Sequence, residues 1–149
     1  MKNFDIDYIK KFITEYPTAK IYLSADSQRV KRKKVRFATV VVVHYEGCKG
    51  GRVFHDVTYE KVVDAKLSRP FNRMMREVTL ITDIYTALED VLIDRDFEVH
   101  IDVNPDVIHG SNVAYGAAKG MIWGMIGIEP VCKPDAWAAS TIADRYTKG

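Results

Sequence analysis

The sequence predicts an α/β fold in which a five-stranded mixed sheet has helices on both faces and is preceded by one N-terminal helix. Two observations predict it. Three segments with strand-like patterns follow one another before residue 60, separated only by short turns. After them, segments of 10 or more residues with helical periodicity alternate with short strands, which is typical of parallel crossovers. We therefore expect an antiparallel meander of three strands that two parallel strands extend.

The composition is that of an ordinary globular protein. Of its 149 residues, 47% are hydrophobic and 28% are charged, and the formal net charge is +2. We expect residues 1–149 to form a single domain. So small a net charge does not by itself indicate a polyanionic partner, which only the distribution of the charges could indicate. Cys48 and Cys132 are too few for a disulfide framework or a zinc site made of cysteines, and we expect both thiols to be reduced.

No segment of the sequence predicts export or a membrane span. The first residues lack the apolar core of a signal peptide. The apolar tract 120–128 is far shorter than the ~20 residues that a membrane-spanning helix needs. We therefore expect a soluble, cytoplasmic protein without a membrane partner.

The first predicted elements are a helix and a short strand. Phe4, Tyr8 and Phe12 recur at four-residue spacing, which is typical of an amphipathic helix, and Pro17 ends it. Residues 21–23 then predict a strand, with Asp26 where that strand leaves the core. A carboxylate on rigid strand backbone suits a catalytic ligand, so we take Asp26 as the first candidate site residue.

A strongly basic segment follows Asp26. Residues 29–36 contain six cations: Arg29, Lys31, Arg32, Lys33, Lys34 and Arg36. Because the next segment, 37–45, is rich in β-branched residues and predicts a buried strand, the basic segment is expected to form the hairpin between two strands. A solvated hairpin tip is the simpler interpretation. Its position beside Asp26 also predicts contacts with nucleic-acid phosphates.

A third strand and a long helix come next. Residues 52–59 alternate as a strand, and residues 71–92 follow the 3.6-residue helical period after Pro70. Glu77 lies at the margin of the apolar stripe of this helix, which faces the sheet that carries Asp26. A rim charge is the simpler interpretation of Glu77, and Asp83 and Asp106 are the alternatives for its place in a site.

Residues 97–103 alternate and predict the fourth strand. His100 and Asp102 share one face of it, and Asp102 lies near its carboxyl end. We expect His100 to be a hydrogen-bonded sheet residue rather than a ligand. Residues 109–127 predict a helix whose glycines, at 116, 120, 124 and 127, form a stripe suited to close packing.

The C-terminal part predicts one more strand and one more helix. Residues 129–132 form a brief fifth strand, and residues 136–148 a slim, alanine-rich helix. Asp144 falls on the same stripe of that helix as Trp137 and Ser140. It is the fourth candidate acid, about as well explained by a site as by a surface position.

Four carboxylates on separate elements indicate a hard cation. Asp26, Glu77, Asp102 and Asp144 offer the oxygen donors that Mg²⁺ or Mn²⁺ prefers, whereas paired cysteine or histidine ligands for zinc are missing from the sequence. Two such ions ~3.5–4 Å apart activate a water and stabilise the leaving oxygen of a phosphodiester. This chemistry needs no nucleophilic side chain, and no Ser-His-Asp or Cys-His set is recognisable here.

Four segments carry a resemblance to a known family: Ile21-Tyr-Leu-Ser-Ala-Asp-Ser-Gln28, Asn72-Arg-Met-Met-Arg-Glu77, His100-Ile-Asp-Val103 and Lys133-Pro-Asp-Ala-Trp-Ala-Ala-Ser-Thr-Ile-Ala-Asp-Arg-Tyr-Thr-Lys148. Together they resemble the YkuK-type family of ribonuclease H-like proteins, from about Lys20 to the end of the chain. The last segment is the most specific.

The resemblance implies a ribonuclease H-like fold and a metal-dependent nuclease. It also implies that Asp26, Glu77, Asp102 and Asp144 are the catalytic and metal-binding residues. The chain departs from the family after Asp102, where residues 103–109 replace a shorter, glycine-bearing turn. Whether Asp106 or His109 joins the site or obstructs it stays open.

Two functions of different class follow. The first is a two-metal nuclease in which the basic segment and Lys133 hold the substrate backbone; RNA, DNA, hybrid and junction substrates stay open, as does the oligomeric state. The alternative is a non-catalytic module of the same fold that binds nucleic acid or protein. A phosphatase or sugar-kinase relative is less favoured, because such chains are longer and no phosphate-binding glycine loop is present.

Overall fold

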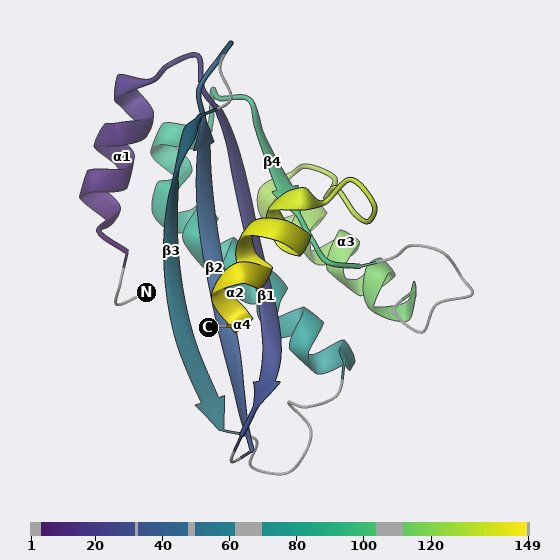
Figure 1. Ribbon diagram of the computed structural model, residues 1–149. Coiled ribbons are helices and arrows are strands. Elements are labelled where there is room, and N and C mark those ends of the chain that lie inside the picture. The colour runs from purple at the N-terminus through teal and green to yellow at the C-terminus, as the bar shows by residue number, and fades with distance from the viewer. Residues whose placement is uncertain (1–3, 32, 48–49, 62–69, 104–111, 149) are drawn as a thin grey trace.

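Four strands form one mixed sheet in the order β3-β2-β1-β4 (Figure 1). The structure, a computed structural model, describes residues 4–31, 33–47, 50–61, 70–103 and 112–148. β1 (Lys20–Val30), β2 (Lys34–His44) and β3 (Gly51–Lys61) form an antiparallel meander. β4 (Phe97–His100) lies parallel to β1. The predicted meander and the parallel fourth strand are confirmed.

Helices cover both faces of this sheet. On one face lie α1 (Ile6–Glu15), α2 (Pro70–Leu92) and α3 (Asn112–Ile126). On the other lie a π-helix, η1 (Ala138–Ala143), and the short α4 (Asp144–Lys148), drawn in yellow in front of the sheet in Figure 1. Strand alternation produces this division, because successive side chains point to opposite faces. Leu23 of β1 packs in the core under α2, whereas its neighbour Tyr22 packs against η1.

The sequence predicted that Asp26 lies where its strand ends, but the strand continues past it. It lies within the 11-residue β1 and pairs with Ala38 of β2. β1 stays paired with β2 as far as Val30, and β3 pairs with β2 over the same length, so the meander extends well past the short apolar run from which the strand was predicted. β4, however, pairs with β1 only as far as Ser24. Asp26 therefore lies two residues beyond the last parallel pair, where β1 has lost that neighbour.

The five-stranded sheet is not confirmed. Over the described residues, the predicted fifth strand is reduced to one isolated parallel bridge, made by Val131. Val131 donates to the Val99 carbonyl at 2.8 Å and accepts from the Ile101 N–H at 3.0 Å. Pro130 has no N–H to extend the ladder, and the next hydrogen bond, from Lys133, is out of parallel register. The segment thus lies beside β4 without forming a regular strand.

The last helix differs from the predicted regular α-helix because it begins as a π-helix. The Asp144 N–H donates to the Ala139 carbonyl, five residues earlier. This wider turn removes Asp144 from the stripe of Trp137 and Ser140 on which α-helical periodicity placed it. The small side chains of this alanine-rich helix allow close packing, since Ala138 and Ala143 are fully buried against the sheet.

The glycine stripe of α3 does not produce the close contact that it predicted. Among the described residues, a Cβ atom added at Gly116, Gly120 or Gly124 would meet no atom within 4 Å, and no contact of this part of the chain explains these glycines. The helix packs instead through Ala118 and Ile122. No helix in the part of the chain that the structure describes is long and apolar enough to cross a membrane.

Candidate active site

The four candidate acids come from β1, α2, the segment after β4 and the start of α4, and they share one electrostatic environment. Burial, together with the charges of Asp102 and Asp144, raises the pKa of Asp26 to about 7. Burial also raises the pKa of Glu77, and the nearby charges of Asp26 and Asp102 add to the effect. Such coupling falls off with distance and with exposure to water. The fold therefore gathers the four carboxylates into one region.

Asp26 is held on the face of β1 that α4 covers. Its side chain is buried, and its Oδ2 accepts a hydrogen bond of 3.3 Å from Thr147 Oγ1 of α4. A backbone hydrogen bond from Ser27 also stabilises the charged form. These two donors do not compensate for lost hydration, so the neutral form of Asp26 persists close to neutral pH.

Glu77 approaches from the opposite face of the sheet. Ser27 Oγ donates a hydrogen bond of 2.6 Å to Glu77 Oε2, and the Glu77 side chain is buried. Ser27 and Asp26 are neighbours on a strand and point to opposite faces. Although the two side chains lie on opposite faces, the charge of Asp26 raises the pKa of Glu77. The charge of Arg73, one turn earlier on α2, lowers the pKa of Glu77 in part.

The structure also places the two alternatives to Glu77. Asp83 is exposed and lines a separate cleft between α2 and β3. Asp106, together with His109, lies outside the described residues. Of the acids on α2, it is Glu77 that interacts with Asp26, although its burial could not be inferred from a position at the margin of the apolar stripe.

Asp102 and Asp144 are each paired with a lysine. Asp102 Oδ1 lies 2.9 Å from Lys133 Nζ, and this buried oxygen makes no hydrogen bond of regular geometry. Asp144 Oδ2 lies 2.9 Å from Lys148 Nζ, one turn along α4. The ammonium of Lys133, which the sequence assigned to substrate phosphates, thus neutralises an acid of the site. The two ammonium groups thus compensate the charges of acids that a bound metal cation would otherwise neutralise.

The donor set fits a hard divalent cation in type and in charge. It consists of carboxylates whose mutual repulsion is only partly compensated. Within the described ranges, however, no three His, Cys, Asp or Glu side chains form a metal-binding cluster. Each acid is turned toward its own hydroxyl or lysine partner. Rotation away from these partners is what a shared ion would require of the side chains.

His100 is a structural residue, as the sequence predicted. Its Nδ1 accepts a hydrogen bond of 3.2 Å from the Ala138 N–H, so the proton resides on Nε2, which donates to Glu98 Oε1 at 2.9 Å. Burial lowers the pKa of His100 and keeps the ring neutral. The ring therefore attaches the start of η1 to β4, upstream of Asp144 on the same helix.

The basic segment forms the hairpin between β1 and β2, as predicted. Its turn includes Lys33, whose φ is +54°, and Arg32 lies outside the described residues. A groove of about 610 Å³ at this hairpin is lined by Arg29, Val30, Lys31, Lys34, Arg36 and Tyr59. Arg36 also donates a hydrogen bond of 2.6 Å to the Thr147 carbonyl, so it holds the end of α4 as well.

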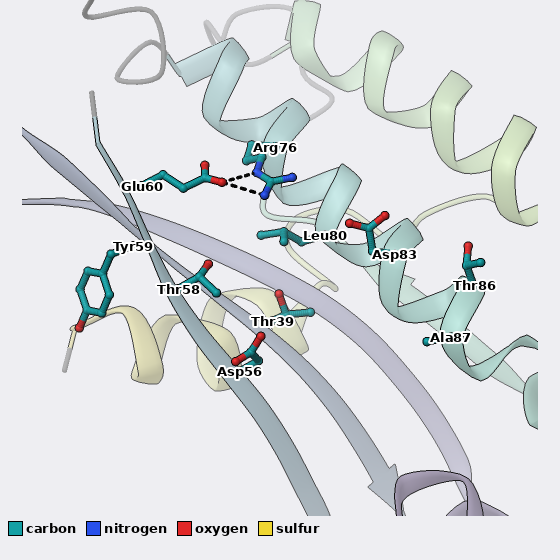
Figure 2. Close-up of a pocket in the computed structure, with 10 residues that line it drawn as sticks. All are labelled: Thr39, Asp56, Thr58, Tyr59, Glu60, Arg76, Leu80, Asp83, Thr86 and Ala87. Atoms are coloured by element: carbon teal, nitrogen blue, oxygen red, sulfur yellow. Dashed lines mark hydrogen bonds and ion pairs between the residues drawn. The ribbon is translucent and has the colours of Figure 1, made fainter. Parts of the chain in front are cut away.

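A second cleft, of about 540 Å³, lies between α2 and the edge of the sheet formed by β2 and β3. Figure 2 shows Asp83 and Thr86 of α2 on one side and Thr39 and Asp56 of the sheet on the other. The ion pair of Glu60 with Arg76, 2.7 Å long, bridges the strand and the helix. This cleft was not predicted from the sequence. The available signal was the polar character of two inward-facing positions, Thr39 and Asp56, which are paired in the ladder.

Comparison with known proteins identifies the family. No curated protein and no solved structure matches the chain. A family model described as ribonuclease H-like matches residues 6–148, which include all four candidate acids. The mixed sheet with helices on both faces is consistent with that fold. The resemblance inferred from the sequence motifs is confirmed at this level: the chain belongs to the ribonuclease H-like family.

Proposed function

We propose that the protein is a divalent-metal-dependent nuclease that hydrolyses phosphodiester bonds of nucleic acid. The observation that carries the proposal is the shared electrostatic environment of the four acids, in which the pKa of Asp26 is raised to about 7. Like charges are crowded together at a cost in stability that a packing role does not require. Clusters of carboxylates with strongly perturbed pKa values are typical of catalytic sites.

Asp26, Glu77, Asp102 and Asp144 would hold Mg²⁺ or Mn²⁺. Bound in a pair, such ions supply an activated water and stabilise the leaving oxygen. Asp26 interacts with each of the other three acids, which supports its role as the shared ligand. Thr147 and Ser27 orient Asp26 and Glu77 from opposite faces of β1.

The two lysines have a role in the same proposal. Lys133 and Lys148 compensate Asp102 and Asp144 when these acids have no other cation. Once the acids turn toward a metal ion, both ammonium groups become available to the phosphate backbone of the substrate. Lys133 would then bind nucleic acid, as the sequence indicated, after its ion pair with Asp102 has opened.

Cleavage of labelled single-stranded and duplex RNA and DNA in the presence of Mn²⁺ tests the proposal. We expect cleavage by the wild type and none above background by Asp26→Asn or Asp102→Asn. The matched control is Asp83→Asn, which changes an exposed acid of the separate cleft and should leave cleavage intact. Cleavage that survives Asp26→Asn would point to a contaminant or another site.

A non-catalytic module of the same fold is the second candidate. The observation that favours it is the pairing of Asp102 and Asp144 with lysines, because acids neutralised in this way need no metal ion. A protein of this kind would bind nucleic acid without requiring Mn²⁺ and would not be stabilised by it.

A further inference from the structure

We infer that the groove at the β1–β2 hairpin binds an unpaired strand of nucleic acid, with one base stacked on Tyr59. The inference rests on the proposed function in taking nucleic acid as the substrate. It goes beyond that function by naming the substrate class, a single-stranded segment, and by assigning a binding role to a residue that the sequence did not single out.

The groove has the charge that a phosphate backbone requires. Four of its six lining residues are cations (Arg29, Lys31, Lys34 and Arg36), and none is an acid. Arg29 and Lys31 are exposed to solvent, and among the described residues neither has an acidic partner. Cations gathered along a groove favour a polyanion through release of its counterions.

Tyr59 supplies the feature that distinguishes a base from a phosphate. It lies on β3, the edge strand of the sheet, and 53% of its surface is exposed. Arg36 fixes the ring, since its Nε donates to Tyr59 Oη at 3.1 Å and its guanidinium carbon lies 5.3 Å from the ring centroid. An oriented aromatic ring beside cations is the arrangement on which single strands stack their bases.

This arrangement selects an unpaired strand over a duplex. In a duplex the faces of the bases are covered by their neighbours, so a tyrosine on a protein surface cannot stack on them. In a single strand the faces are accessible, and aromatic stacking tolerates any base. The cations contribute to binding of both forms, whereas the ring contributes only to binding of the unpaired one.

The groove is linked to the acids by two hydrogen bonds. Arg36 donates from Nη1 to the Thr147 carbonyl at 2.6 Å, and Thr147 Oγ1 donates to Asp26 Oδ2 at 3.3 Å. The residue that orients Tyr59 is therefore also in contact with the helix that covers Asp26. A strand anchored at Tyr59 lies beside α4, on the face of the sheet that holds the reacting group of the proposed nuclease.

Binding measured in EDTA tests the inference without requiring cleavage. Fluorescence anisotropy would compare three labelled probes: a single-stranded oligonucleotide, its duplex, and a strand of equal length that consists of abasic sites. We expect Tyr59→Leu to weaken single-strand binding roughly 5- to 100-fold, as loss of one stacked base does, and to leave duplex and abasic-strand binding unchanged. Tyr59→Phe keeps the ring but loses the hydrogen bond from Arg36, so it should retain most of the single-strand affinity that Tyr59→Leu loses.

Matched variants separate stacking from charge. Lys31→Ala should weaken binding of all three probes and lower the salt slope by about 0.7 for the single strand. The controls are Trp123→Ala, an exposed aromatic on α3, and Lys11→Ala, an exposed lysine on α1; neither should affect binding. Should Tyr59→Leu lose its fold, as judged by its melting temperature, Tyr59→Trp replaces it and should bind the single strand more tightly than the wild type.

Two results would overturn the inference: unchanged single-strand affinity of Tyr59→Leu, or an equal loss for all three probes, which would reveal an unselective polyanion surface. Failure of the proposed function has a different signature. Asp26→Asn should bind the single strand in EDTA at least as tightly as the wild type while it loses cleavage. Continued cleavage by Asp26→Asn would refute the nuclease site and leave the groove standing.

Discussion

Ser27 Oγ donates a hydrogen bond of 2.6 Å to Glu77 Oε2, and this bond joins α2 to β1 at the residue next to Asp26. It has an unusual setting, because the accepting carboxylate is buried and its pKa is raised by that burial and by the charge of Asp26. A serine in this position does not neutralise Glu77. It fixes the position of the Glu77 carboxylate beside β1.

We predict that Ser27→Ala destabilises the metal-free protein at pH 8 by about 1–3 kcal/mol, because it leaves a buried carboxylate without its hydroxyl donor. Urea denaturation measures the change. In the Glu77→Met background, where no carboxylate remains, the same substitution should cost much less. Equal costs in the two backgrounds would show that the hydrogen bond does not contribute to stability.

The raised pKa of Asp26 predicts how stability depends on pH. The folded protein holds this proton up to a pKa of about 7, whereas a free aspartate releases it near the model value of 3.8. The contribution of Asp26 to stability is therefore complete below about pH 4 and is lost as pH rises to 7. Its upper limit is on the order of 4 kcal/mol, since one pKa unit corresponds to about 1.4 kcal/mol.

Asp26→Asn isolates this contribution. The asparagine keeps the shape of the side chain and has no proton to lose. In EDTA we expect Asp26→Asn to be more stable than the wild type at pH 8 and to differ little from it at pH 4. The measurement is the free energy of unfolding in urea at a series of pH values. A difference between the two proteins that does not grow from pH 4 to pH 8 would contradict the raised pKa.

Manganese should stabilise the wild type if the acids form a metal site. A ligand that binds only the folded state adds RT ln(1 + [L]/Kd), or about 2.7 kcal/mol at 100 times its Kd. Because protons compete for the same carboxylates, the rise in melting temperature should be larger at pH 8 than at pH 6. Asp83→Asn should keep the effect and Asp102→Asn should lose it. An unchanged melting temperature at saturating Mn²⁺ favours the non-catalytic module.

His100 offers a test of how the last helix is held. His100→Leu introduces an apolar side chain of similar size and leaves the Ala138 N–H without its acceptor, which we expect to cost about 1–3 kcal/mol. Displacement of η1 should also reduce the stabilisation by Mn²⁺, because Asp144 lies at the end of that helix. The control is His44→Leu at the end of β2, a half-buried histidine. Stability of His100→Leu equal to that of the control would exclude the anchoring role.

Local pattern was sufficient for the elements that are defined by period. The meander followed from the β-branched run of β2 and from the turns on either side of it, and α2 followed from its 3.6-residue stripe. Both patterns reflect which side of an element meets the core, and that information is contained in neighbouring residues. The family was likewise accessible from motifs in the chain.

The candidate site itself depends on contacts between residues that are distant in sequence. Asp26 and Thr147 are 121 residues apart, and Ser27 and Glu77 are 50 apart. No local pattern could show that Glu77 is buried, that Lys133 neutralises Asp102, or that the π-helical turn moves Asp144. The same holds for the shortened fifth strand, whose ladder depends on register with β4.

The sequence by itself determined the meander, the long helix, the supply of carboxylates and the family, because periodicity and motif are properties of adjacent residues. Only the tertiary structure decided where β4 stops beside β1, how far the pKa of Asp26 rises, and that Tyr59 faces a groove of cations. These properties depend on which distant groups are packed together and on how much water is left between them.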